Sequence, residues 1–266
     1  MKIIDCFPFY NELSMLELRL KELNQLVDHF VLVESTVSFA NKSKPLFYDE
    51  NKKLFEAYSD KIIHVVVDDM PPDKFWKSKN QTSLKRAQHQ RNKIREGIEQ
   101  CSPSAKDIIL ISDVDEIPDT NTLKDTVERG FDKIYNLKQD MYYYNTTCKS
   151  KDPWSLAIIS SYNLLQPYLK DLDKLRRDRT FCKEDEKIEK GGWHLTYFGG
   201  TEAIINKLQN FSAHKQFGTD EFTSIQNVES AIANNLDLFD RDGHSFERIT
   251  RAENRYLPEH INMIEE

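Results

Sequence analysis

The chain contains 266 residues and carries a formal net charge of −7; 39% of its residues are hydrophobic, 11% are aromatic and 30% are charged. The aromatic content excludes an intrinsically disordered chain, and the length predicts a single domain over residues 1–266. The acidic balance argues against a nucleic-acid-binding protein. No apolar run approaches the ~20 residues of a membrane-spanning helix, and residues 1–12 lack the uninterrupted apolar stretch of a secretory signal, so we expect a cytoplasmic protein.

Predicted strands alternate with predicted helices through the first half of the chain. Apolar residues recur every three or four positions between Leu13 and Val27, which is typical of an amphipathic helix. The expected strands cover residues 2–9, 30–34, 62–67 and 107–112, and the expected helices cover 54–58, 82–100 and a segment that begins at Asn11 or Ser14. This alternation predicts βαβ units and a largely parallel sheet. Such a sheet binds its ligands beyond the carboxyl ends of its strands.

The second half of the chain, from residue 119, is less regular. We expect helices at 119–130, 201–211 and 221–234, and antiparallel strands at 134–144 and 155–165. A charged surface loop is expected at 170–190 and a segment rich in glycine and aromatic residues at 191–200. No internal repeat or linker divides the sequence. One continuous domain is therefore predicted, with residues 1–118 and 119–266 as its two halves.

An acidic cluster follows the predicted strand at 107–112. Asp113 and Asp115 are separated by one residue, and Glu116 adds a third carboxylate. Carboxylates at the end of a buried strand are suited to hold Mg²⁺ or Mn²⁺ against a diphosphate. The alternative is a structural turn in which Asp119 caps the following helix, and both interpretations are compatible with the sequence.

The glycine-rich segment at 191–200 contains Trp193 and His194. An indole ring can stack against a sugar or a base, and a neutral imidazole can ligate a metal. The alternative is that His194, a lone histidine beside Trp193, is a satisfied core residue.

Basic residues concentrate in two places, on the predicted helix at 82–100 and near Arg176, Arg177 and Arg179. Arginine forks match phosphate oxygens, although most cations on a helix are simply solvated. Glu34 ends a predicted strand and, with Lys44, is a candidate to contact the base or ribose of a nucleotide; a carboxylate that caps the loop is the alternative.

Taken together, four segments in the order 33–47, 69–92, 113–118 and 192–212 resemble glycosyltransferase family 17, the β-1,4-mannosyl-glycoprotein 4-β-N-acetylglucosaminyltransferases. They contain Val33-Glu34-Ser35, Asp69-Met70-Pro71-Pro72, Arg91-Asn92, Asp113-Val114-Asp115-Glu116-Ile117-Pro118, Gly192-Trp193-His194 and Phe198-Gly199-Gly200. The resemblance implies an α/β fold of GT-A type, with a Rossmann-like, mostly parallel central sheet flanked by helices and a smaller antiparallel acceptor-side portion. A Golgi location is expected only if a membrane anchor has been removed from the chain.

The resemblance also implies roles for individual residues. It indicates a divalent metal, Mn²⁺ or Mg²⁺, held by Asp113 and Asp115 and completed by the late histidine, His194. Arg91 is the candidate for donor binding within the Arg-Asn pair, and Arg179 is the candidate for the diphosphate. Asp113 and Trp193 are expected to contact the donor as well.

An inverting transferase needs a general base that takes a proton from the acceptor hydroxyl. Glu116, Asp140, Asp220 and Glu221 are the candidates, and we prefer Glu116 because it is close to the metal pair in sequence.

The expected function is metal-dependent transfer of a sugar, GlcNAc from UDP-GlcNAc, to the hydroxyl of a glycan acceptor. A nucleotidyltransferase or phosphohydrolase that uses the same carboxylates, and a non-catalytic glycan-binding module, are the alternatives.

Overall fold

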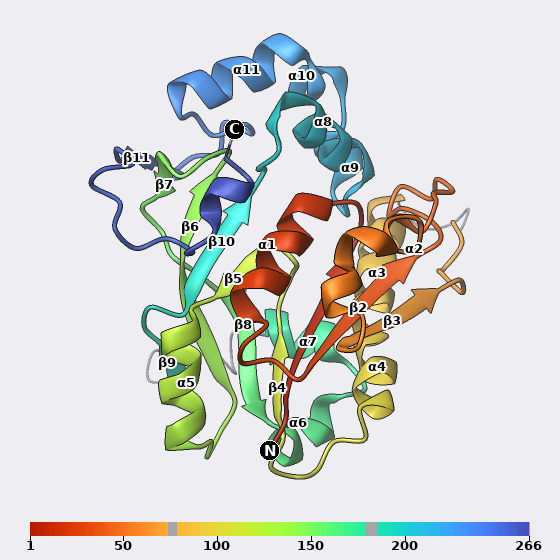
Figure 1. The fold of residues 1–266 in the computed structure, drawn as a ribbon. Coiled ribbons are helices and arrows are strands. Elements are labelled where there is room, and N and C mark those ends of the chain that lie inside the picture. Colours follow the sequence, from red (N-terminus) through yellow and green to blue (C-terminus); the bar gives the residue numbers. More distant parts are fainter. Residues whose placement is uncertain (74–78, 179–185, 266) are drawn as a thin grey trace.

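The computed structural model describes residues 1–73, 79–178 and 186–265, and its first four strands form a parallel sheet in the order β4-β1-β2-β3 (Figure 1). These strands are β1 (Ile3–Phe9), β2 (His29–Ser35), β3 (Ile62–Val67) and β4 (Ile108–Ile111). They confirm the four predicted strands to within one residue at each end. All four residues of β4 are apolar and buried, as expected for a parallel strand that is covered on both faces.

The complete sheet is mixed, which corrects the prediction that it is mostly parallel. Beyond β4 it continues antiparallel through β8 and β6 to β7 and β11, while β10 lies between β6 and β5, and β9 pairs with β6. These strands are β5 (Glu116–Pro118), β6 (Tyr135–Tyr143), β7 (Cys148–Ser150), β8 (Trp154–Ser161), β9 (Lys187–Ile188), β10 (Gly192–Thr196) and β11 (Phe246–Arg248). Residues 144–153 join β6 to β8 through turns and a short strand instead of a crossover helix, and antiparallel pairing follows.

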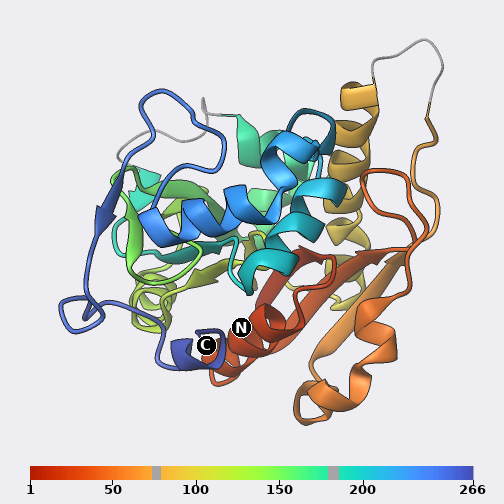
Figure 2. The same cartoon turned by 90° about the horizontal axis from the view of Figure 1, so that it is seen from above.

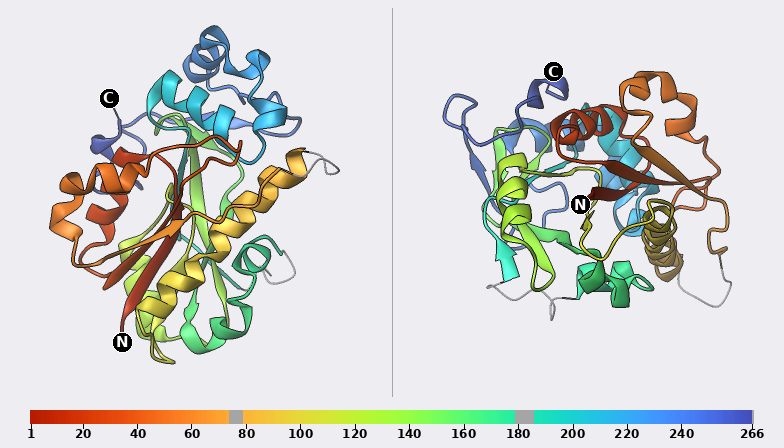
Figure 3. Two further views of the ribbon diagram at one scale, coloured as in Figure 1. Left: turned by 90° about the vertical axis from the view of Figure 1, so that its right-hand side faces the viewer. Right: turned by 60° about the horizontal axis from the view of Figure 1, so that its bottom comes forward.

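Helices cover both faces of the parallel sheet (Figures 2 and 3). On one face, α1 (Leu13–Leu23) buries a row of leucines against Phe7, Phe30 and Leu110. On the other, α4 (Ile94–Gln100), α6 (Tyr162–Leu165) and α7 (Leu172–Arg177) pack against the opposite side chains of the same strands. The approach of α4 to β2 is close, since a Cβ atom on Gly97 would lie 2.2 Å from a methyl carbon of Val31.

The remaining helices lie along the edges and above the sheet. They are α2 (Phe47–Glu50), η1 (Lys52–Tyr58), α3 (Lys79–Asn92), α5 (Thr120–Arg129), η2 (Gln166–Tyr168), α8 (Gly200–Asn210), α9 (His214–Phe217), α10 (Asp220–Thr223), α11 (Ile225–Asn234) and η5 (Ile261–Met263). In Figure 1, α8 to α11 form a cap above the carboxyl ends of β1 and β2, opposite the N-terminus. This cap places α8 over the end of β4, where the acidic cluster follows.

The helix α7 corrects the first part of the surface loop expected at 170–190, of which residues 179–185 lie outside the described residues. Its N-terminus is capped by Asp171, whose side chain accepts a hydrogen bond from the amide of Lys174 at 3.1 Å, and Leu172 and Leu175 are buried. Among the described residues, no helix is both long and apolar enough to cross a lipid bilayer.

Candidate active site

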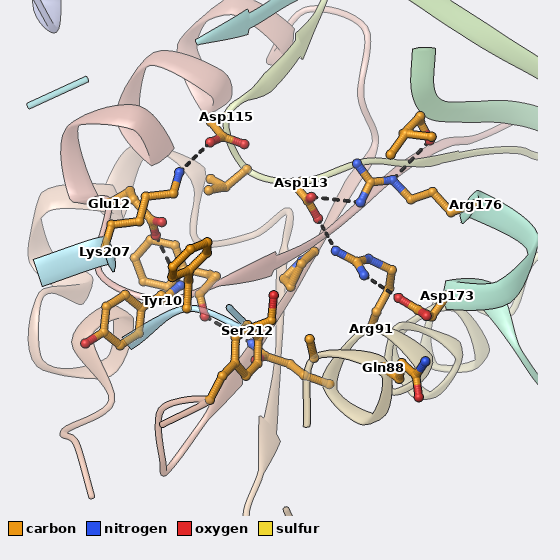
Figure 4. Close-up of a pocket in the computed structure, with 18 of the residues that line it drawn as sticks. Tyr10, Glu12, Gln88, Arg91, Asp113, Asp115, Asp173, Arg176, Lys207 and Ser212 are labelled. Carbon is orange, nitrogen blue, oxygen red and sulfur yellow. Dashed lines mark hydrogen bonds and ion pairs between the residues drawn. The ribbon is translucent and has the colours of Figure 1, made fainter. Parts of the chain in front are cut away.

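A cavity of about 440 Å³ opens beyond the carboxyl ends of β1, β2 and β4, and we call it the main cavity (Figure 4). Side chains from α3, α7, α8 and β10 complete its wall. Its charged lining among the described residues comprises Glu12, Arg91, Asp113, Asp115, Asp173, Arg176, Arg177, His194 and Lys207. Open parallel sheets bind ligands at this edge, and the volume suits a small molecule.

Arg19 of α1 holds the turn that carries the acidic cluster. This guanidinium is fully buried and pairs with Asp5 of β1, at 2.6 and 2.8 Å. It also donates to the carbonyl oxygens of Asp113, at 2.9 Å, and Glu116, at 2.7 Å. A buried ion pair with further hydrogen bonds is costly to disturb. Arg19 therefore fixes the backbone of the turn, although the helical pattern alone marks it only as one residue of an amphipathic helix.

Asp113 lies between two arginines from different helices (Figure 4). Its Oδ1 accepts from Arg91 of α3 at 2.6 Å, and its Oδ2 is 2.8 Å from Arg176 of α7. Burial alone would raise the pKa of Asp113, but Arg176 and Arg91 outweigh it and hold that pKa well below its ordinary value. Asp113 is thus a fixed anion within a cationic frame.

Glu116 is fully buried behind Asp113. Its Oε1 accepts from Arg176 and from the indole of Trp154, the latter at 2.5 Å, and its Oε2 accepts from the amide of Asp113 at 3.0 Å. A general base must reach the acceptor hydroxyl. The preference for Glu116 as that base is therefore replaced by a positioning function, in which it holds Arg176 and Trp154 at the wall of the cavity.

Asp115 has different surroundings, although it is only two residues from Asp113. Its Oδ2 accepts from Lys207 of α8 at 2.7 Å, and its Oδ1 lies 3.6 Å from Nε2 of His194. Burial alone would raise the pKa of Asp115, but Lys207 and His194 together lower it well below its ordinary value.

The pairing of β10 with β5 brings His194 to this position, opposite Glu116 in the register. The close approach requires glycine at position 192, where φ is +119° and a Cβ atom would lie 2.1 Å from the carbonyl oxygen of Ile117. The imidazole packs against Trp154, with ring centroids 4.6 Å apart. Its Nδ1 is buried without a hydrogen-bond partner among the described residues.

The three predicted metal ligands are not assembled into one set. No group of three His, Cys, Asp or Glu side chains in the described ranges is arranged to hold a metal, because the carboxylate of Asp113 is occupied by Arg91 and Arg176. Asp115 Oδ1 and His194 Nε2 face each other, however, and form an oxygen–nitrogen donor pair that suits Mn²⁺ or Mg²⁺ when phosphate oxygens complete the coordination. The residues present therefore fit a metal with two protein ligands.

Comparisons with known proteins agree with the motifs. The model of glycosyltransferase family 17 matches residues 1–256. The chain belongs to glycosyltransferase family 17. The β-1,4-mannosyl-glycoprotein 4-β-N-acetylglucosaminyltransferase of Rattus norvegicus is 21% identical over 294 aligned residues, which cover 98% of this chain and 52% of the relative. The chain thus spans about half the length of the curated relative it matches.

Among solved structures, the bifunctional IspDF of Campylobacter jejuni matches 79% of this chain and 54% of its own, with 12% identity and a TM-score of 0.33.

Trp193 lies in the core of this family 17 chain and is not among the described residues that line the main cavity. Its indole Nε1 donates to the carbonyl oxygen of Tyr256 at 3.0 Å, and the two rings pack 4.8 Å apart. Successive residues of a strand point to opposite faces. Because His194 of β10 faces the cavity, Trp193 faces the core, which replaces the expected contact with the donor.

Glu34 and Lys44 also lie outside the described lining of the main cavity. Glu34 is fully buried, and it accepts hydrogen bonds from Lys44 at 3.0 Å, from the amide of Phe47 at 2.6 Å and from His64 at 3.1 Å. The alternative interpretation, a carboxylate that caps the loop, is the one that the structure shows.

The other candidate bases do not contribute to the described lining of the main cavity. Asp140 of β6 pairs with Lys149 at 2.6 Å, and Asp220 and Glu221 are exposed on α10; none of the three belongs to the described lining of the main cavity. Arg179 lies outside the described residues.

Two functional elements were missed from the sequence. The helix α7 supplies Asp173, which accepts from Arg91 at 2.5 Å, and Arg176, and its capping Asp171 was the signal that could have revealed it. Lys207 is the lysine of the helix predicted at 201–211, and nothing in the sequence indicates that it meets Asp115.

Proposed function

We propose that this family 17 chain transfers GlcNAc from UDP-GlcNAc to a saccharide hydroxyl, with inversion at the anomeric carbon, on a fold of GT-A type. The single observation that carries the proposal is the meeting of Asp115, His194 and Lys207 in a cavity at the carboxyl end of β4. The family match supports transferase chemistry, and the name of the rat relative supports GlcNAc as the sugar.

The main cavity offers distinct surroundings to the two parts of a nucleotide. Apolar side chains of Phe9, Phe39 and Leu84 line it toward β1, β2 and α3, where a nucleoside can pack. Arg91, whose buried Nε has no hydrogen-bond partner among the described residues, and Lys207 lie toward the acidic turn, where we place the diphosphate.

The charge balance of the main cavity favours a bound cation. Its described lining contains four carboxylates (Glu12, Asp113, Asp115 and Asp173) and four cations of lysine and arginine (Arg91, Arg176, Arg177 and Lys207), so their formal charges cancel. A nucleoside diphosphate brings additional negative charge. A divalent metal on Asp115 and His194 would neutralise that charge and stabilise the leaving diphosphate.

The side chains of this protein then have separate tasks. Asp115 and His194 form the cation site, and Lys207 keeps Asp115 ionised with its other oxygen directed toward His194. Asp113 binds both Arg91 and Arg176 and so keeps them in place beside the diphosphate. Because these cations are already positioned by α3, α7 and α8, the departing charge is stabilised with little rearrangement.

The test is thermal unfolding of the full chain with UDP, with Mn²⁺ and with both, followed by UDP release from UDP-GlcNAc. We expect UDP and Mn²⁺ to raise the Tm together more than either alone, since each completes the site of the other. Stabilisation by nucleoside triphosphates and not by UDP would contradict the proposal and favour a nucleotidyltransferase. Binding without UDP release, under any metal, would favour a glycan-binding module.

A further inference from the structure

A second cavity, of about 890 Å³, lies beside the main cavity, and we call it the side cavity. Glu12, Asp115 and Lys207 line both, so the ion pair between Asp115 and Lys207 forms part of the wall that separates them. The side cavity extends between the start of α1, the end of β10 and α8. Its volume lies within the range of cavities that bind small molecules.

The lining of the side cavity suits a saccharide. Tyr144, Tyr197 and the partly exposed Phe198 contribute to its wall, and the two tyrosine rings, with centroids 6.4 Å apart, are largely buried in the aromatic cluster that adjoins it. Aromatic faces pack against the apolar face of a sugar ring, while Asn145 and Thr147 on the same wall can hydrogen-bond its hydroxyls.

The backbone at this wall is strained. Tyr144 and Tyr197 have φ values of 66° and 61°, in the left-handed region that a bulky residue rarely adopts. Strained backbone of this kind persists where the surrounding structure holds it, and it clusters at ligand sites. The two rings are therefore held in place before a ligand binds.

Glu12 is a carboxylate that lines both cavities, and it lies beside Lys207 in the main cavity (Figure 4). Its Oε2 accepts from the amides of Asn11, at 3.0 Å, and Tyr10, at 3.3 Å, and these bonds fix the carboxyl group at the start of α1. Burial alone would lower the pKa of Lys207, but Asp115 and Glu12 raise it, which reflects the proximity of Glu12 to this ammonium.

The other carboxylates that line the described parts of the two cavities each pair with a cation. Asp113 is held by two arginines, and Asp173 pairs with Arg91 and Arg177. One oxygen of Glu265 lies 3.6 Å from Arg251. Asp115 lines both cavities but pairs with Lys207, so Glu12 is the carboxylate in both described linings that has no ion pair with another described residue.

We propose that the side cavity binds the acceptor saccharide and that Glu12 is the general base of the transfer. This inference rests on the proposed function. The acceptor hydroxyl gives its proton to the Glu12 carboxylate, its oxygen forms the new bond to the anomeric carbon, and the bond from that carbon to the diphosphate oxygen breaks, with its electron pair leaving on UDP. The geometry is that of a base between two substrates, one in each cavity.

The first test replaces Glu12 by glutamine, which keeps the shape of the side chain and removes its basicity. UDP release from UDP-GlcNAc with Mn²⁺ is measured with water as the acceptor and with added methyl β-mannoside. We expect Glu12→Gln to lower kcat about 100-fold or more, while the Tm shift given by UDP with Mn²⁺ stays as in the unchanged protein. Glu17→Gln, an exposed glutamate of the same helix, is the matched control and should keep full activity.

The outcomes separate the two proposals. If the unchanged protein neither binds UDP nor releases it, the proposed function fails. The second outcome is that the unchanged protein turns over UDP-GlcNAc and that the kcat of Glu12→Gln lies within about threefold of it, a smaller loss than removal of a base produces. The proposed function then stands, and the assignment of Glu12 is overturned.

The second test obstructs the side cavity at Ala203, which lines it from α8 and does not belong to the described lining of the main cavity. Ala203→Trp should raise the KM for methyl β-mannoside about tenfold, an effect of the size that lost contacts to one ring produce, and should leave the UDP-induced Tm shift unchanged. Glu202→Trp places the same bulk at an adjacent exposed position outside both linings. An equal KM for the two variants, or turnover of UDP-GlcNAc that does not respond to methyl β-mannoside in the unchanged protein, would overturn the acceptor assignment.

Discussion

Asp113 and Asp115 belong to one short turn but stand in two different regions of the molecule. The Asp113 region comprises Asp113, Arg91, Arg176 and the buried Glu116, and it is built from α3, α7 and the turn itself. The Asp115 region comprises Asp115, Lys207 and His194, built from α8 and β10, and it borders both cavities. In the Asp113 region, each carboxylate oxygen of Asp113 and Glu116 contacts an arginine, an indole or a backbone amide. In the Asp115 region, Oδ1 of Asp115 faces the imidazole of His194 at 3.6 Å.

This difference shows that two identical residues of one motif need not share a task. Two arginines neutralise Asp113 and give it a structural function: it keeps Arg91 and Arg176 close to each other despite their like charges. One lysine neutralises Asp115, which retains a ligand position toward His194. We therefore expect the two aspartates to respond differently to the same substitution.

The largest expected effect is on catalysis by the Asp115 region. Asp115→Asn removes the carboxylate that we propose as a metal ligand, and we expect kcat/KM for UDP-GlcNAc to fall about 1000-fold, equivalent to several kcal/mol of transition-state stabilisation. Mn²⁺ binding to the UDP complex, measured by isothermal titration calorimetry, should be lost as well. Asp113→Asn should retain Mn²⁺ binding, because its carboxylate is directed to arginines.

Asp125→Asn, at an exposed position of α5, is the matched control and should change neither quantity. Loss of Mn²⁺ binding in Asp113→Asn with retention in Asp115→Asn would reverse the assignment of the two regions.

The second effect is on stability, through the Asp113 region. Arg176→Met leaves the fully buried Glu116 without its cation, and breaking a buried pair in this way costs about 3–5 kcal/mol. Urea unfolding should show this loss. The neighbouring Arg177 also pairs with a carboxylate, but its side chain is 51% exposed, so Arg177→Met should cost no more than about 1 kcal/mol. Equal losses for the two variants would show that the Asp113 region adds no special stability.

The sequence was sufficient for the parallel strands of the first half of the fold. β1 to β4 and α1 follow from apolar runs and helical spacing, because each is covered by a neighbour in the same βαβ order. The helix expected at 82–100 is instead divided at Lys93 into α3 and α4, and α2 was not expected. The position of Asp113 and Asp115 at the carboxyl end of β4 followed from the same argument, as did family membership from the spacing of the motifs.

The partners of these residues could not be predicted in the same way. Arg176 is 63 positions from Asp113 in the chain, and Lys207 is 92 from Asp115, so each contact depends on how the second half folds back. In that half the antiparallel strands expected at 134–144 and 155–165 are found as β6 and β8, but their joining to β4 in one mixed sheet was not expected, and α7 was taken for a loop. Glu116 looked catalytic because of its neighbours in sequence, whereas its burial is a property of the packed structure.

The smallest expected effect is the dependence of stability on pH in the Asp113 region. Because Arg176 and Arg91 hold the pKa of Asp113 below its ordinary value in the folded state, the ionised carboxylate stabilises the fold above the unfolded pKa of about 3.9, and this contribution is lost as the pH falls toward the folded pKa. The free energy of unfolding of the unchanged protein should therefore exceed that of Asp113→Asn by a margin that shrinks by on the order of 1 kcal/mol between pH 6 and pH 3. Arg91→Met, which removes one of the two guanidinium groups, should bring the folded pKa of Asp113 closer to the unfolded one, so its margin should shrink by less over the same pH range. A margin that stays constant down to pH 3 would mean that the arginines do not shift Asp113, and the contrast between the two regions would then depend on Asp115 alone.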